Sequence, residues 1–253
     1  MIVAASSRCF CDLPLDAALG RLVELEYTNV EIVIHESGGH LKPSDVLADL
    51  DRAVQICRKT HRLSAVAYSV DVEAPSDEEY YRQFAACCKL AKATKVVTIA
   101  IRAAELGTPF NAEVERLAEM VRIAALEGVR IGLLTEAGRM TEDPSTAVVL
   151  CDNVRGLSIT LDPSHFVFGS RRGSSPRSFE QLMKYVCHVR LRDTSKDELQ
   201  VRVGQGEVEY GRLVTQLNKV HYNRALCVDI APMPGIDQNA EMRKMRLLLE
   251  SLL

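Results

Sequence analysis

The chain lacks the features that mark several classes of protein. It has no excess of basic residues, because its formal net charge is -3 and its pI is near 6.1. We therefore expect no nucleic acid partner. It also has no apolar run near the roughly 18 residues of a membrane span, and no basic leader before an apolar stretch. We expect no membrane association and a cytoplasmic location.

The cysteines lack the spacing of a metal or redox site. None of the eight forms a CxxC pair, and several lie inside apolar runs. We interpret most of them as small core residues in a reducing compartment. They are Cys9, Cys11, Cys57, Cys87, Cys88, Cys151, Cys187 and Cys227.

The chain does contain a regular alternation of strand-like and helix-like segments. Its 253 residues, 47% of them hydrophobic, can bury roughly three quarters of the unfolded surface as one domain, residues 1–253. Eight short apolar runs have the nearly continuous hydrophobicity of parallel strands covered on both faces. These runs are Ile2 to Ala5, Val30 to Ile34, Leu63 to Tyr68, Lys95 to Ile101, Val129 to Leu134, Leu157 to Leu161, Val186 to Leu191 and Ala225 to Ile230.

Segments with helical spacing separate these runs. They include Leu13 to Leu25, Pro43 to Cys57, Asp77 to Ala93, Ala112 to Leu126 and Asn239 to Leu252. A doubly wound sheet, the main alternative, is expected to carry a glycine-rich turn after its first strand, and Ser6 to Phe10 contains no glycine. The pattern therefore predicts an α/β fold, a single (β/α)8 TIM barrel.

Chemistry in such barrels lies at the carboxyl ends of the strands, so polar residues that end apolar runs are the candidates. Glu136, Asp162 and Asp229 end the last strands, and His188 lies within strand seven. Three carboxylates converging at one mouth require a cation to offset their charge. His165, three residues after Asp162, is a further candidate.

Three motifs carry a resemblance to a known family over essentially the whole chain. They are Leu161-Asp162-Pro163-Ser164-His165, the run from His188 to Asp193, and Val203-Gly204-Gln205-Gly206-Glu207-Val208-Glu209-Tyr210. With them the chain resembles the xylose isomerase-like TIM-barrel superfamily of sugar isomerases and epimerases, dehydratases and AP endonucleases. The resemblance implies a divalent metal (manganese, magnesium, cobalt or zinc) held by residues of strands five to eight.

In this resemblance Glu136 and Asp162 match two metal ligands, and Asp229 replaces the strand-eight glutamate. Arg190 occupies the position of the strand-seven histidine, three residues before Asp193. A guanidinium cannot ligate a metal, so three alternatives follow. His188 replaces the missing ligand in a deeper site, Arg190 pairs with Glu136, Asp162 or Asp229, or Arg190 holds an anionic group of the ligand.

The resemblance implies an isomerase or epimerase of a small sugar or sugar derivative, with Glu136 and Asp229 as acid/base groups and His165 contacting the substrate. The alternatives are a dehydratase of the same family, or a metal-free binding barrel in which Arg190 replaces the metal. An AP endonuclease is disfavoured, because its additional strand-three and strand-four histidines are missing. Dimers and tetramers are common among relatives, so a homo-oligomer is an option.

Asp193 is expected to order the loop that follows it. Other residues near the mouth are weaker candidates for contacting the substrate. Besides Arg190 and His188, the candidates for binding a polyol or phosphate are His35, Tyr68 and Arg102, which end strands two to four. Glu31 looks like the family's strand-two glutamate. The cluster Arg171-Arg172 after strand six is a candidate phosphate clamp.

Overall fold

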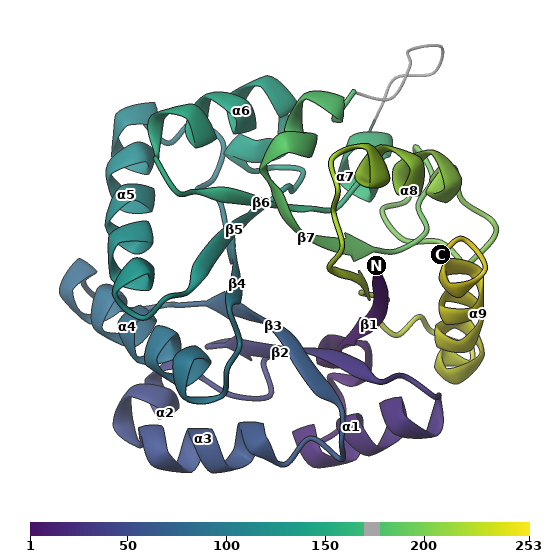
Figure 1. Ribbon diagram of the computed structural model, residues 1–253, viewed down its shortest axis with the longest axis horizontal. Helices are drawn as coiled ribbons and strands as arrows, with labels where there is room; N and C mark the ends of the chain where they lie inside the picture. The colour runs from purple at the N-terminus through teal and green to yellow at the C-terminus, as the bar shows by residue number, and fades with distance from the viewer. Residues whose placement is uncertain (170–177) are drawn as a thin grey trace.

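The computed structural model describes residues 1–169 and 178–253, and it contains a closed barrel of eight parallel strands in the order β1 to β8. Figure 1 shows the ring of strands with helices around its outside. Strand β1 pairs with β8, with Ala5 opposite Val228, which closes the ring. The predicted TIM barrel is confirmed. The strands are Ile2–Ser6, Asn29–His35, Ser64–Asp71, Thr98–Arg102, Arg130–Leu134, Ser158–Leu161, Val186–Leu191 and Ala225–Val228.

The helices lie outside the barrel and cover the apolar outer face of the strands. Those described are α1 (Leu15–Glu24), α2 (Pro43–Ala48), α3 (Leu50–Arg58), α4 (Asp77–Ala93), α5 (Phe110–Leu126), α6 (Pro144–Asn153), α7 (Ser164–Val167), α8 (Tyr210–Lys219) and α9 (Gln238–Glu250), with three short 3₁₀ turns. The segment predicted as one helix from Pro43 to Cys57 is divided at Asp49. This residue has an extended backbone and caps α3 by accepting from the Arg52 amide.

The alternation of side chains along each strand separates the main core from the barrel interior. Along β7, Val189 and Leu191 belong to the main core, whereas Arg190 lines the cavity at the mouth of the barrel. The small residues Ala4, Ala225 and Cys227 form a second apolar cluster. The wide apolar core therefore lies between strands and helices, and the interior carries the polar groups.

Strand β3 extends to Asp71, three residues beyond the end that the sequence predicts. This longer strand corrects the expectation for Tyr68. Its side chain is fully buried on the helix side, where its hydroxyl lies 2.7 Å from Oγ1 of Thr94. Because alternate residues face opposite ways, Ser69 and Asp71 line the mouth in its place.

Asp193 orders the long loop after β7, as expected. Its carboxylate accepts from the amides of Gly204 (2.8 Å), Gly206 (3.1 Å) and Thr194 (3.1 Å). The Tyr210 hydroxyl donates to the carbonyl of Arg192 over 3.0 Å. These bonds tie the loop to the end of β7 and so fix the rim of the barrel.

No helix of the described part of the chain has the length and apolarity needed to cross a bilayer.

Candidate active site at the mouth of the barrel

A cavity of about 340 Å³ opens at the carboxyl ends of the strands. Its size lies in the range of small-molecule sites, and its place is where barrel active sites occur. Charged and imidazole side chains from many strands line it. They are Arg8, His35, Asp71, Glu73, Arg102, Glu136, His165, Arg190 and Arg192.

Glu136 lies at this cavity and is paired with Arg102. The guanidinium donates from Nε to Oε2 over 2.9 Å and from Nη2 to Oε1 over 2.6 Å, and it also reaches Asp71 at 3.4 Å. Burial favours a higher pKa for Glu136, but Arg102 outweighs it and the pKa lies below its usual value. Glu136 is therefore an ionised carboxylate, as an acid/base role at neutral pH requires, but its lone pairs face a guanidinium.

Asp162 is fully buried at the end of β6 and is held from two sides. Ser164 donates to Oδ1 from its amide (3.0 Å) and from its hydroxyl, and Arg192 donates from Nη2 to Oδ2 over 2.8 Å. Burial favours a raised pKa for Asp162, but the charge of Arg192 and these bonds lower it. The carboxylate is therefore ionised and already has a counter-ion.

Asp229 is buried beside Asp162 and has two arginine partners. Arg8 donates to it through Nε (2.9 Å) and Nη2 (2.6 Å), and Arg192 reaches it at 3.3 Å. Although burial favours a raised pKa, these arginines hold the pKa of Asp229 far below its usual value. Asp229 does not line the mouth cavity, whereas its partner Arg8 does.

Arg190 does not pair with Glu136, Asp162 or Asp229, and that expectation is wrong. It pairs instead with Glu31 of β2, through Nη2 to Oε1 at 2.9 Å and Nε to Oε2 at 3.2 Å. The register explains the difference, because Arg190 lies opposite Cys227. Two residues along a strand cover roughly 6 to 7 Å, so Arg192, not Arg190, lies level with Asp229.

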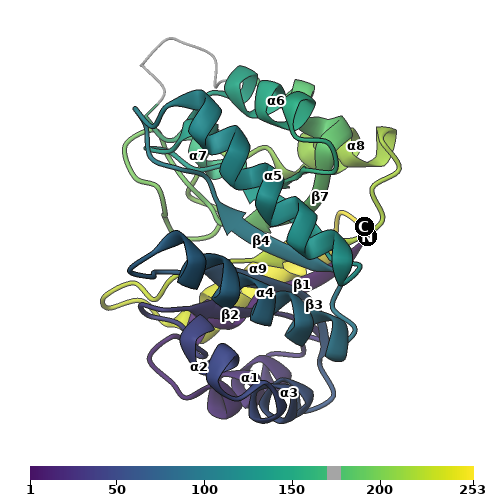
Figure 2. The same ribbon diagram turned by 90° about the vertical axis from the view of Figure 1, so that its left-hand side faces the viewer.

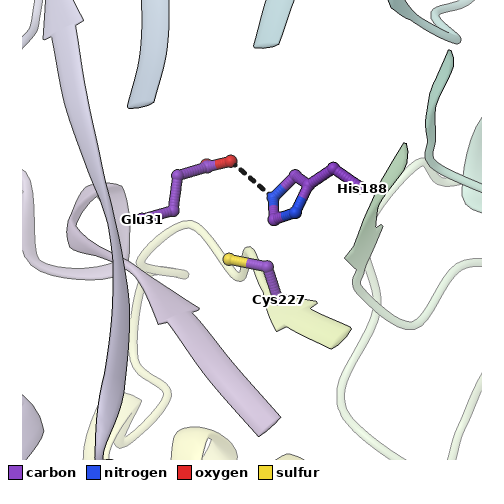
Figure 3. Close-up of side chains that lie close together, drawn as sticks. All are labelled: Glu31, His188 and Cys227. Atoms are coloured by element: carbon purple, nitrogen blue, oxygen red, sulfur yellow. Dashed lines mark hydrogen bonds and ion pairs between the residues drawn. The ribbon is translucent and has the colours of Figure 1, made fainter. Parts of the chain in front are cut away.

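His188 lies deeper still, where the deeper-site alternative placed it, and its imidazole contacts Glu31 and not Glu136, Asp162 or Asp229. Its Nε2 is 2.8 Å from Oε2 of Glu31, and the sulfur of Cys227 lies close by (Figure 3). The ligand atoms of Glu31, His188 and Cys227 all lie within 4.8 Å of one another. This is a second candidate metal cluster, inside the barrel and below the mouth.

Neither set of residues fits a divalent ion. An ion shared by Asp162 and Asp229 would take the place of Nη2 of Arg192, which lies within 3.3 Å of both carboxylates. An ion at Glu31 would lie next to Arg190, whose guanidinium contacts both oxygens of that carboxylate. Guanidinium groups already supply the positive charge that these carboxylates require.

The two histidines at the mouth act as neutral groups. The backbone amide of Ala137 donates to Nδ1 of His165 over 3.1 Å, so the ring hydrogen is on Nε2, 3.6 Å from Asp162. Burial lowers the pKa of His165, and Asp162 only partly opposes this. His35 lies 2.8 Å from the Ser69 hydroxyl, and burial together with Arg190 lowers its pKa to about 4.

Four charged mouth residues were missed as candidates in the sequence, namely Arg8, Asp71, Glu73 and Arg192. Arg192 lies two positions after the inward-facing Arg190, and strand alternation could have identified it. Arg8 lies in a 3₁₀ turn after β1, where no such alternation applies. Asp71 could not have been found without the longer β3. The predicted cluster Arg171-Arg172 lies outside the described residues.

The comparisons with known proteins agree with the fold. A superimposable structure is a xylose isomerase-like TIM barrel protein from Mycobacterium smegmatis in complex with magnesium, with a TM-score of 0.77, 14% identity and coverage of 100% of this chain and 98% of that chain. A D-tagatose 3-epimerase-like protein has a TM-score of 0.73 and 16% identity over 100% and 98% of the two chains.

A probable 3-DHS dehydratase from Bacillus anthracis has a TM-score of 0.73 and 14% identity over 99% of both chains. At such identities these likenesses show the fold alone. A comparison with curated protein sequences found no match. The family model described as "Xylose isomerase-like TIM barrel" matches residues 19–250, and the chain therefore belongs to the xylose isomerase-like TIM barrel family.

Proposed function

We propose that the mouth binds a small sugar or sugar derivative and that the protein is an isomerase or epimerase. The observation that carries this proposal is the ring of carboxyl, guanidinium and imidazole groups around a 340 Å³ cavity at the strand ends. Such groups are suited to binding several hydroxyls at once. The epimerase names among the structural neighbours support the same class of substrate.

In this proposal Glu136 is the proton acceptor. It lines the cavity, is ionised, and takes the proton from the carbon next to the substrate carbonyl. The electron pair of the broken C–H bond passes to the carbonyl oxygen and gives an enediolate. Delivery of the proton to the former carbonyl carbon, with the neighbouring hydroxyl hydrogen passing to the other oxygen, gives isomerisation. Protonation of the original carbon on its opposite face, by a donor other than Glu136, gives epimerisation.

The developing oxyanion needs positive charge or hydrogen-bond donors, and this chain's own side chains supply both. Arg190 and Arg192 line the cavity and are held in place by buried carboxylates. Fixed donors of this kind stabilise charge without reorganising during the reaction. We therefore propose that the reaction does not depend on a divalent ion between Asp162 and Asp229.

Arg102 must move before Glu136 can act as a base, because it occupies both carboxylate oxygens. Its side chain is 38% exposed, whereas those of Arg190 and Arg192 are 7% and 9% exposed. Arg102 is thus free to turn toward a substrate oxygen. Binding of substrate would release the base and also provide a guanidinium contact to the ligand.

A dehydratase is the second candidate, and His165 favours it. Its Nε2–H at the mouth can donate a hydrogen bond to a leaving hydroxyl, which departs as water with the proton that Glu136 has taken from the adjacent carbon. Both reactions pass through the same enolate-type intermediate. Analysis of the products separates them.

The test is proton exchange in D2O, followed by NMR, with a panel of ketoses, aldoses and their acids. We expect deuterium incorporation at the carbon next to the carbonyl without added metal, and about a hundredfold loss or more in Glu136→Gln. Glu119→Gln is the matched control, because Glu119 is also paired with an arginine, Arg122, but lies on the outer face of α5. Equal exchange in wild type and Glu136→Gln would refute the proposed role.

A further inference from the structure

The opposite end of the barrel, its floor, carries two adjoining cavities of about 340 and 390 Å³. Both lie at the amino ends of the strands, the side that holds the two chain termini (Figure 2). Lys95, Thr98 and His188 line the first, Arg130, Lys184 and His221 line the second, and Arg224 lines both. No aspartate or glutamate lines either cavity within the described parts of the chain.

Three cations of the floor lack the partners that every arginine of the mouth has. Over residues 1–169 and 178–253, Lys95, Arg130 and Arg224 make no side-chain hydrogen bond or ion pair, whereas the Lys184 ammonium lies 4.6 Å from the centre of the Tyr185 ring. This local concentration of positive charge occurs in a chain of net charge -3. Like charges repel one another, and a bound anion would offset that repulsion.

Arg224 joins the two cavities, since it lies beside Cys187 in the wall of the first and beside Arg130 in the wall of the second. The Thr98 hydroxyl lies in the wall of the first cavity and Asn223 in that of the second. Guanidinium, ammonium, hydroxyl and amide donors together are the groups that bind phosphate.

We propose that the floor is a binding site for a small phosphate-bearing anion, either inorganic phosphate or a phosphate monoester. The proposal is independent of the chemistry at the mouth. The amino end of a TIM barrel is not the catalytic end, so the site binds its ligand without acting on it. The size of the cavities favours a small molecule over an extended polymer.

Titration calorimetry on the full chain in low-chloride buffer tests the proposal, with inorganic phosphate and glucose 6-phosphate as probes. We expect saturable binding of one or both, weakened about tenfold or more by Arg224→Ala, weakened by Lys95→Ala, and largely restored by Arg224→Lys. Arg243→Ala, which removes an exposed cation on α9, is the matched control and should bind as wild type. Both floor residues lack partners, so the variants should fold, which the unfolding midpoint checks.

Several outcomes would overturn the proposal. One is the absence of saturable binding of either probe. Another is unchanged binding in Arg224→Ala and Lys95→Ala, and a third is loss of binding in the mouth variant Arg192→Lys but not in the floor variants. Binding of a single-stranded oligonucleotide, without binding of either small probe, would assign the floor to a polymeric partner instead.

Discussion

The guanidinium of Arg192 donates from Nη2 to Oδ2 of Asp162 over 2.8 Å, at the point where the family resemblance implies a metal ion. The same nitrogen lies 3.3 Å from Asp229. A protein side chain therefore bridges two carboxylates that a divalent cation would otherwise bridge. The charge balance of the mouth depends on Arg8, Arg102 and Arg192, which lie at or just after the ends of β1, β4 and β7, as much as on the acidic residues.

Replacing Arg192 by methionine should destabilise the fold by about 3 to 5 kcal/mol, because it leaves buried Asp162 with no cationic partner. Urea unfolding measures the change. Arg82→Met on the exposed face of α4 also removes an ion pair, with Glu79, and should cost less than about 1 kcal/mol. Similar small losses in both variants would show that Asp162 is not held as a buried ion.

Arg190 and Glu31 should show strong energetic coupling. Arg190→Met leaves a fully buried carboxylate with only His188 as partner, and we expect a loss of about 3 kcal/mol or more. Adding Glu31→Gln to that variant should recover part of the loss, because it removes the unpaired charge. A double-mutant cycle by chemical denaturation measures the coupling. Additive effects would contradict the pairing.

His35 should make stability depend on pH between about 6.5 and 4. Its pKa is about 4 in the folded chain, and the ordinary value of 6.5 applies after unfolding. In this window the unfolded state binds a proton that the folded state does not, so stability is lost as the pH falls, by roughly 2 to 3 kcal/mol in total. In His35→Gln, the unfolding midpoint should depend less on pH over this range. If the unfolding midpoint of the variant changes with pH as steeply as that of the wild type, the lowered pKa of His35 is contradicted.

Gly206 should not tolerate a side chain. A Cβ there would lie 2.0 Å from Oδ1 of Asp193 and 2.5 Å from the carbonyl of Thr194. Gly206→Ala should therefore break the Asp193 bonds of the loop and cost about 1 to 3 kcal/mol. Gly211→Ala on α8 meets nothing within 4 Å and should instead stabilise by about 0.5 to 1 kcal/mol. Thermal unfolding compares the two variants. Higher stability in both would contradict the clash expected at position 206.

The sequence was sufficient to predict the barrel, because strands buried on both faces are continuous apolar runs and Glu136, Asp162 and His165 follow two of them. It was not sufficient to assign the ion pairs. The partner of Arg190 is 159 residues away in the chain, and the pairing depends on the register across the barrel. The prediction for Tyr68 was wrong for a local reason. Strand β3 continues beyond the apolar run from which the end of the strand was predicted.

Metal content is the most direct test of the central claim that guanidiniums replace the cation of the mouth. The untagged protein is incubated with manganese, desalted and measured by inductively coupled plasma mass spectrometry. We predict no stoichiometric manganese in the wild type. One equivalent of manganese, retained by the wild type and lost in Asp162→Ala, would show that Arg192 yields its place to a metal ion and would contradict the claim.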